Sequence, residues 1–128
     1  MATTYAYGSQ VWGSVALNAQ PIVIDNTNST FSFDVDSVHY EIAIPFGTYK
    51  TDRDHFTSEL IDPINNQLVL ASAPVFVRLG GIHIDNHIDV LVIEHNDKTA
   101  SHTIDNFGGT ALNVIFGTIQ FTFPPRTI

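Results

Sequence analysis

The residues best suited to metal chemistry lie in one short stretch of this cysteine-free chain. His83, Asp85 and His87 alternate with isoleucines, so on a continuous strand their side chains share one face. Residues four apart on such a face are separated by about 13 Å, and zinc–nitrogen bonds are only about 2 Å long. A straight strand therefore gives a polar strip facing solvent, whereas a hairpin at Asp85-Asn86, the turn signal that we favour, would bring His83 and His87 together. We treat them as weak metal-ligand candidates and expect no metal or cofactor.

Sequence patterns typical of catalytic sites are missing. The chain has no Gly-x-Ser-x-Gly elbow, no His-Glu-x-x-His, no glycine-rich phosphate loop and no EF-hand pattern. The absence of cysteine excludes disulfides, thiolate metal sites and a cysteine nucleophile. Asp52 and Asp54 form a carboxylate pair, but they fall in the first turn of a predicted helix, where the helix dipole favours negative charge. We therefore predict no catalytic residues and a protein that is not an enzyme.

The stretch Tyr40–Asn65 predicts the element around which the chain is organised, a strand followed by a tight turn and a helix. Pro45 ends the strand because it has no N–H to donate, and Thr51 is a suitable helix N-cap. Pro63 would interrupt a helix, so we expect a kink there or an end near Ile61. Apolar residues recur at helical spacing at Phe56, Leu60, Ile61 and Ile64. The pattern predicts one amphipathic helix near residues 51–62, with its apolar side on a sheet.

Short apolar runs separated by Gly, Pro, Asn and Asp predict β-structure elsewhere. The turn signal at Asp36-Ser37 predicts a hairpin, and the run Ile88–Ile93 is apolar on both faces, as expected for a central strand. We expect strands at Ile22–Asp25, Thr30–Asp36, Val38–Ile44, Leu68–Ala71, Val75–Leu79, Ile88–Ile93, Ser101–Ile104 and Thr118–Phe123, with a loop at Asn106–Gly109. The predicted fold is α+β, a mainly antiparallel sheet of about seven or eight short strands with one helix packed on it. The 128 residues suit a single domain, residues 1–128.

Aromatic residues near both ends of the chain are candidates for contacts between subunits. Residues 1–14 are polar and small apart from these aromatics, which is typical of a loose or subunit-bridging arm. Tyr and Trp are favoured at interfaces, although Trp12 would equally well cover the core of its own domain. The interface candidates are Tyr5, Tyr7, Trp12, Phe121 and Phe123.

The charge of the chain limits its partners. Thirteen acidic and five basic residues give a net charge of −8, and no Lys or Arg precedes Lys50. Such a surface repels phosphate, so we expect neither nucleic acid nor an anionic membrane as a partner. No apolar run approaches the roughly 18–20 residues of a membrane span, and no Sec-type signal peptide is visible.

The most specific motif is Ile-Pro-Phe-Gly-Thr-Tyr at residues 44–49, which ends the predicted strand and precedes the predicted helix. Further matching positions are Phe56, Leu60, Ile64-Asn65, Val75–Leu79, Ile88–Ile93, Gly109-Thr110-Ala111 and Gly117. In this order the chain resembles the α+β modules inserted into bacterial flagellins and flagellar hook-associated or cap proteins, and related modules of phage tails and virions. It departs from them at Pro63 and in having no long terminal heptad helices.

The resemblance implies a structural, surface-exposed role with no catalytic residues to carry over. We expect a self-associating subunit or surface domain of a phage virion or tail or of a flagellar-type filament. Its partners would be copies of itself and other structural proteins of the particle, at an extracellular surface. We expect an excised module or a small phage or virus-like structural protein, and the Met-Ala start favours the latter. The alternatives are a carbohydrate- or host-receptor-binding module, and a His/Asp metal protein or enzyme using His83, Asp85 and His87.

Overall fold

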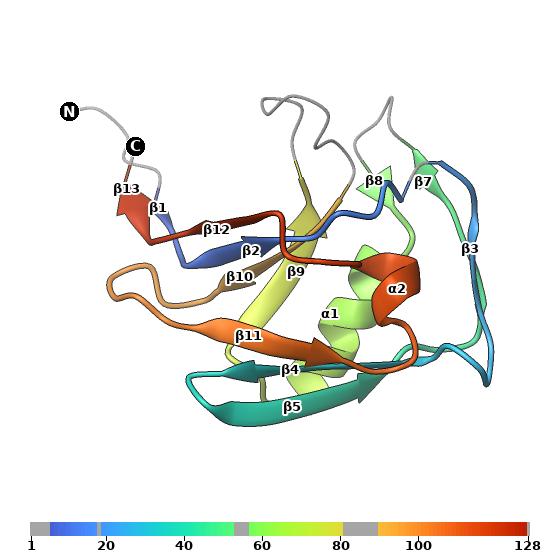
Figure 1. Ribbon diagram of the computed structural model, residues 1–128, viewed down its shortest axis with the longest axis horizontal. Helices are drawn as coiled ribbons and strands as arrows, with labels where there is room; N and C mark the ends of the chain where they lie inside the picture. The colour runs from blue at the N-terminus through green and yellow to red at the C-terminus, as the bar shows by residue number, and fades with distance from the viewer. Residues whose placement is uncertain (1–5, 18, 53–56, 81–89, 128) are drawn as a thin grey trace.

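Two antiparallel sheets face each other across the core (Figure 1). This computed structural model describes residues 6–17, 19–52, 57–80 and 90–127. The first sheet has the order β12-β2-β10-β9, and its strands are β2 (Gln10–Trp12), β9 (Val75–Leu79), β10 (Leu91–His95) and β12 (Phe121–Phe123). The second has the order β11-β4-β5, and its strands are β4 (Thr30–Val35), β5 (Val38–Ala43) and β11 (Ile104–Gly108).

Two helices and three short ladders complete the described part of the chain. The helices are α1 (Ile61–Leu70) and α2 (Leu112–Ile115). The ladders join β1 (Ala6–Tyr7) to β13 (Arg126–Thr127), β3 (Ile22–Ile24) to β6 (Gly47–Tyr49), and β7 (Thr51–Asp52) to β8 (Thr57–Ser58). The predicted α+β class is confirmed, with nine strands of three or more residues where about seven or eight were expected.

Alternating residues of β4 build the centre of the core. Phe31, Phe33 and Val35 are buried, as their period-2 spacing predicts. Rings from β11 and the end of α2 close over them, and the Phe107 and Phe116 centroids lie 4.4 Å apart. Turn residues Asp36 and Ser37 have φ values of 50° and 70°, so the predicted hairpin between β4 and β5 is confirmed.

The helix predicted near residues 51–62 lies later in the chain. Thr51 belongs to β7, and its Oγ1 lies 2.8 Å from the Ser58 hydroxyl across a small hairpin. Helix α1 begins at Ile61, so Pro63 sits in its first turn, where a missing N–H costs no hydrogen bond. Leu60 and Ile64 are buried as predicted, and Leu68 extends their apolar stripe. The expected strand Leu68–Ala71 is therefore wrong, and Phe56 lies outside the described residues.

Other differences concern the two ends of the chain. Residues 10–12 are not a loose arm, because they form β2, a buried strand between β12 and β10. The strand expected at Ser101–Ile104 begins at Ile104 and runs through the stretch expected to be a loop. The register shifts between Asp105 and Gly108, and the bulge accommodates turn-type residues inside a strand. The expected final strand, Thr118–Phe123, begins at Phe121.

Candidate functional site

The residues predicted from sequence as ligands or contacts fall into three groups. The metal-ligand candidates His83, Asp85 and His87 lie outside the described residues, as does Tyr5. Tyr7 belongs to β1. The other three aromatic residues, Trp12, Phe121 and Phe123, lie together on the face of the four-stranded sheet that is turned away from the core.

Trp12 packs inside its own domain. Its side chain is only 4% exposed, and its ring meets Phe121 and Phe123 edge-on at centroid distances of 6.4 and 6.0 Å. Val90 and Val92 complete this apolar cluster. In the single chain Trp12 is thus covered by an apolar cluster on the outer face of the four-stranded sheet, separate from the main core.

A second feature of this face is the buried carboxylate of Glu94. It accepts hydrogen bonds from Arg78 Nε at 3.2 Å, Gln10 Nε2 at 3.3 Å and the backbone N–H of Gly8 at 3.3 Å. The other end of the Gln10 amide accepts a bond from Trp12 Nε1 at 3.0 Å, and the Arg78 guanidinium lies 5.8 Å from the Trp12 ring. A charge paired in this way is tolerated in a protein interior, so we assign the network a structural role.

Two histidines and two aspartates meet at one end of the molecule, and we call Asp36, His95, Asp97 and His102 the histidine cluster. Asp36 comes from the β4–β5 turn, His95 ends β10, and Asp97 and His102 lie between β10 and β11. His102 uses both ring nitrogens. Its Nδ1 lies 2.6 Å from Asp36 Oδ2, and its Nε2 lies 2.8 Å from Asp97 Oδ2.

Backbone hydrogen bonds fix the position of the histidine cluster. Asp36 Oδ1 accepts the N–H of Thr103 at 2.9 Å, and the Asp36 N–H donates to the Thr103 carbonyl at 2.8 Å. Ser9, just before β2, accepts the N–H of His95 on its carbonyl and the N–H of His102 on its hydroxyl. The cluster thus ties the β4–β5 turn of one sheet to two strands of the other.

The pKa values of the two histidines are shifted in opposite directions. Hydrogen bonds to Asp97 and then to Asp36 raise the pKa of His102, because both carboxylates favour the imidazolium. Burial lowers the pKa of His95, and the neighbouring positive charge of His102 lowers it further. His95 Nδ1 also accepts the N–H of Asp97 at 2.9 Å, so this nitrogen carries no proton. The hydrogen bond from His102 holds the pKa of Asp97 far below its usual range.

The composition of the histidine cluster suits a metal, but its geometry does not. Ligand atoms of Asp36, His95 and His102 lie within 4.8 Å of one another. The two imidazole rings, however, are stacked in parallel, with centroids 3.6 Å apart and an interplanar angle of 2°. A ring nitrogen binds a metal through a lone pair in the plane of its ring, and an ion cannot lie in two parallel planes. The arrangement instead suits an imidazolium held between two carboxylates.

We expect the pKa of His102 to lie above the ordinary histidine value and the pKa of His95 to lie below it. The contribution of His102 to the free energy of unfolding should be fully present below about pH 6.5 and lost as the pH rises through its raised pKa. The contribution of His95 to the free energy of unfolding should be fully present above about pH 6.5 and lost as the pH falls through its lowered pKa. NMR titration of the ring protons measures both pKa values directly.

Matched variants would separate the two contributions. In urea unfolding measured from acid to alkaline pH, His102→Gln should reduce the loss of stability on the alkaline side. His95→Gln should reduce the loss just below about pH 6.5. Two imidazoles that titrate together near their ordinary pKa would contradict the cluster as described.

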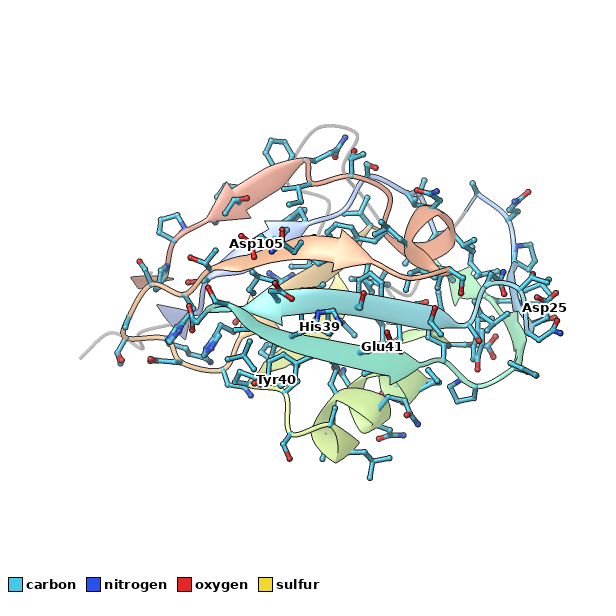
Figure 2. The ribbon with its side chains drawn as sticks, turned by 60° about the horizontal axis from the view of Figure 1, so that its bottom comes forward. Asp25, His39, Tyr40, Glu41 and Asp105 are labelled. Carbon is cyan, nitrogen blue, oxygen red and sulfur yellow. The ribbon has the colours of Figure 1, made fainter. Side chains whose placement is uncertain are left out.

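The outer face of the three-stranded sheet carries another polar group. Asp34 on β4 lies opposite His39 on β5 and Asp105 on β11. His39 Nδ1 is 2.8 Å from Asp34 Oδ1, and Asn106 Nδ2 donates to Asp34 Oδ2 at 2.8 Å. Figure 2 shows His39 and Glu41 on β5 and Asp105 on β11. Exposure on this face is greatest at His39 and Glu41 on the edge strand β5, and Asp34 is half-buried.

Sequence reasoning did not find the histidine cluster or the group around Asp34. Asp36 and His102 are 66 positions apart, so no local spacing indicates that they meet. The one available signal was the number of histidines in a chain without cysteine. Among the described residues, neither helix is long and apolar enough to cross a bilayer. Comparison with protein-family models, with curated proteins and with solved structures gave no match.

Proposed function

We propose that this protein is a non-enzymatic structural module that associates with copies of itself. The observation that carries the proposal is the position of β5, which lies at the edge of its sheet beyond β4. No strand in the described ranges pairs with its other side. An edge strand offers N–H and C=O groups to another chain, and proteins use such edges for assembly.

The exposure of β5 supports this role. Val38, His39, Glu41 and Ala43 are exposed, whereas Ile42 points into the core. An edge strand that a protein protects from pairing is usually very short, bulged, or protected by lysine or proline. β5 has six residues in unbroken register with β4 and contains neither lysine nor proline. β5 therefore lacks these sequence features, and helix α1 packs against the strand.

The kind of particle is inferred from the resemblance to flagellar and phage modules. We propose a subunit or surface domain of a virion, a tail or a flagellar-type filament, at an extracellular surface and in contact with other structural proteins. The motif at residues 44–49 supports this proposal in part, since it follows β5 and its last three residues form β6. The helix of the resembling modules follows that turn directly, whereas here the β7–β8 hairpin stands between them.

Neither alternative gains support from the described side chains. A glycan-binding module would present exposed aromatic rings over a groove; Trp12 is buried, and the exposed ring of Phe46 lines no groove described in this part of the chain. A metal site in the histidine cluster would need the stacked rings to turn. The candidates His83, Asp85 and His87 belong to the part of the chain that is not described.

We expect the full chain to form oligomers whose fraction rises with protein concentration. Sedimentation velocity over a wide concentration range measures this, and electron microscopy shows whether filaments or closed particles form. Because copies with a net charge of −8 repel one another, added salt should strengthen the association.

A monomer at the highest concentration in both low and high salt would contradict the proposal. Deletion of residues 1–14 is not a useful control, because it removes the buried strand β2.

A further inference from the structure

We propose that two copies of this chain pair in antiparallel fashion through β5, with the two-fold axis at Tyr40. The inference rests on the proposed function and specifies its contact. The pairing would join two three-stranded sheets into one continuous sheet, with β5 of each copy at the junction. Three observations carry it: the direction of the backbone groups, the charges on the outer face and an exposed apolar residue on the inner face.

The hairpin register determines which backbone groups of β5 point outward. Val35 and Val38 flank a two-residue turn and therefore form its closing hydrogen-bonded pair. The Ile44 N–H donates to the Ser29 carbonyl at 2.7 Å, which continues the same alternation. Even-numbered residues of β5 thus bond to β4. The N–H and C=O groups of its odd-numbered residues, His39, Glu41 and Ala43, point to the open edge.

Of the symmetric registers centred on His39, Tyr40 or Glu41, only one places a histidine opposite a glutamate. With the axis at Tyr40, His39 of each copy faces Glu41 of the other, twice in the dimer. With the axis at Glu41, the two Glu41 carboxylates face each other. With the axis at His39, the two imidazoles do so. Two carboxylates directly opposite on a sheet repel each other, whereas an imidazole and a carboxylate form a hydrogen bond, so the Tyr40 register is preferred.

The His39 ring is already placed for such a contact. Its Nδ1 is held by Asp34 on the neighbouring strand, and its side chain is 62% exposed. The structure shows no partner for Nε2 among the described residues. In the Tyr40 register this second nitrogen faces Glu41 of the other copy, so the ring would lie between Asp34 of its own chain and that carboxylate. The remaining charged residue of this face, Asp105, lies beyond Asp34 at the far edge of the sheet.

The same register places the exposed apolar residue of the inner face, Val38, beside the other copy. Val38 is 53% exposed in the single chain, and the register places it opposite Ile42 of the other copy. Tyr40 packs against Phe33 of its own chain with a centroid distance of 6.3 Å. In the dimer its backbone would lie on the two-fold axis, opposite the backbone of Tyr40 in the other copy. Figure 2 shows His39, Tyr40 and Glu41 along the strand that would form this junction.

A pair of charge variants tests the register in the full chain. Glu41→Lys places a lysine opposite His39, and His39→Glu places a glutamate opposite Glu41. Each variant alone should associate about tenfold more weakly than the natural chain. An equimolar mixture should recover dimers, because the two substituted side chains then face each other as a glutamate–lysine pair, and the second site keeps its natural pair. Native mass spectrometry distinguishes this heterodimer by mass.

Controls separate this inference from general charge effects and from misfolding. Asp105→Lys makes the same change in charge as Glu41→Lys, on the same face but at the opposite edge of the sheet, so association should not weaken. Circular dichroism checks that each variant is folded. In this cysteine-free chain, Tyr40→Cys should form a disulfide-linked dimer on oxidation more readily than Glu41→Cys, because only residue 40 meets its own copy.

The outcomes distinguish the register from the proposed function. Single variants that associate as the natural chain does, or a mixture that forms no heterodimer while the natural chain oligomerises, would overturn the β5 register and leave self-association standing. A natural chain that stays monomeric at every concentration would overturn both.

Discussion

Replacement of Phe31 by alanine should lower the free energy of unfolding by about 3–5 kcal/mol. Phe31 is fully buried on β4, and its ring contacts three others, with centroids 5.6 Å from Phe33, 6.0 Å from Phe107 and 6.0 Å from Phe116. These rings come from three separate elements, so the loss cannot be filled by the movement of one neighbour. For a domain whose total stability is about 5–15 kcal/mol, the variant should be largely unfolded at moderate denaturant concentration.

The chain provides a matched control for this substitution. Phe46 lies between β5 and β6 with 67% of its side chain exposed, so Phe46→Ala should change the unfolding free energy by less than about 0.5 kcal/mol. Urea unfolding followed by circular dichroism compares the two variants with the natural chain. Equal losses for both would show that Phe31 does not occupy the centre of the core as described. Protein concentration should be kept constant, because self-association adds to the measured stability.

The fold class was predictable because it depends on local patterns that survive in the structure. The alternation of Phe31, Phe33 and Val35 identified both a strand and its buried face. Asp36-Ser37 identified the turn, and the apolar run ending at Ile93 identified a central strand. In each case neighbouring residues provide enough information, since a period of two and a turn signal are both readable within a few positions.

The position of the helix was not predictable in the same way. Thr51, Asp52 and Asp54 are good first-turn residues, and Pro63 was interpreted as the end of a helix. Proline is equally typical of the first turn, and both interpretations fit a stripe that contains Leu60 and Ile64. In the structure Thr51 pairs with Ser58 in the β7–β8 hairpin, so the helix begins after it. No local sequence signal indicates this pairing.

The candidate sites depend on strand order, and strand order is a property of the whole chain. Asp36 meets His102 only because β11 pairs with β4, and β5 is an edge strand only because no later segment in the described part of the chain pairs with it. Residues of the histidine cluster are ordinary polar residues in their local context. Prediction of such sites from one sequence therefore requires the tertiary pairing first.

The second large effect is expected at Gly109, which has a φ of 97° where the chain leaves β11. An alanine Cβ at this position would lie against the Thr30 carbonyl oxygen and 2.8 Å from Phe31 Cα, both of them backbone atoms of β4. This contact cannot be relieved by a side-chain rotation, and the same carbonyl already accepts the Ala111 N–H at 2.7 Å. Gly109→Ala should therefore cost roughly 3 kcal/mol or more, from backbone strain and overpacking together.

The preceding residue is a control that differs by one position. A Cβ on Gly108 would meet only the Ser32 hydroxyl, at 3.1 Å, and a side chain can move by the few tenths of an ångström required. Gly108→Ala should therefore change the unfolding free energy by no more than about 1 kcal/mol. Thermal and urea unfolding of the two variants measure the difference. If Gly109→Ala were as stable as Gly108→Ala, the close approach of this turn to the first residues of β4 would be wrong, and with it the docking of β11 that positions Asp36 beside His102.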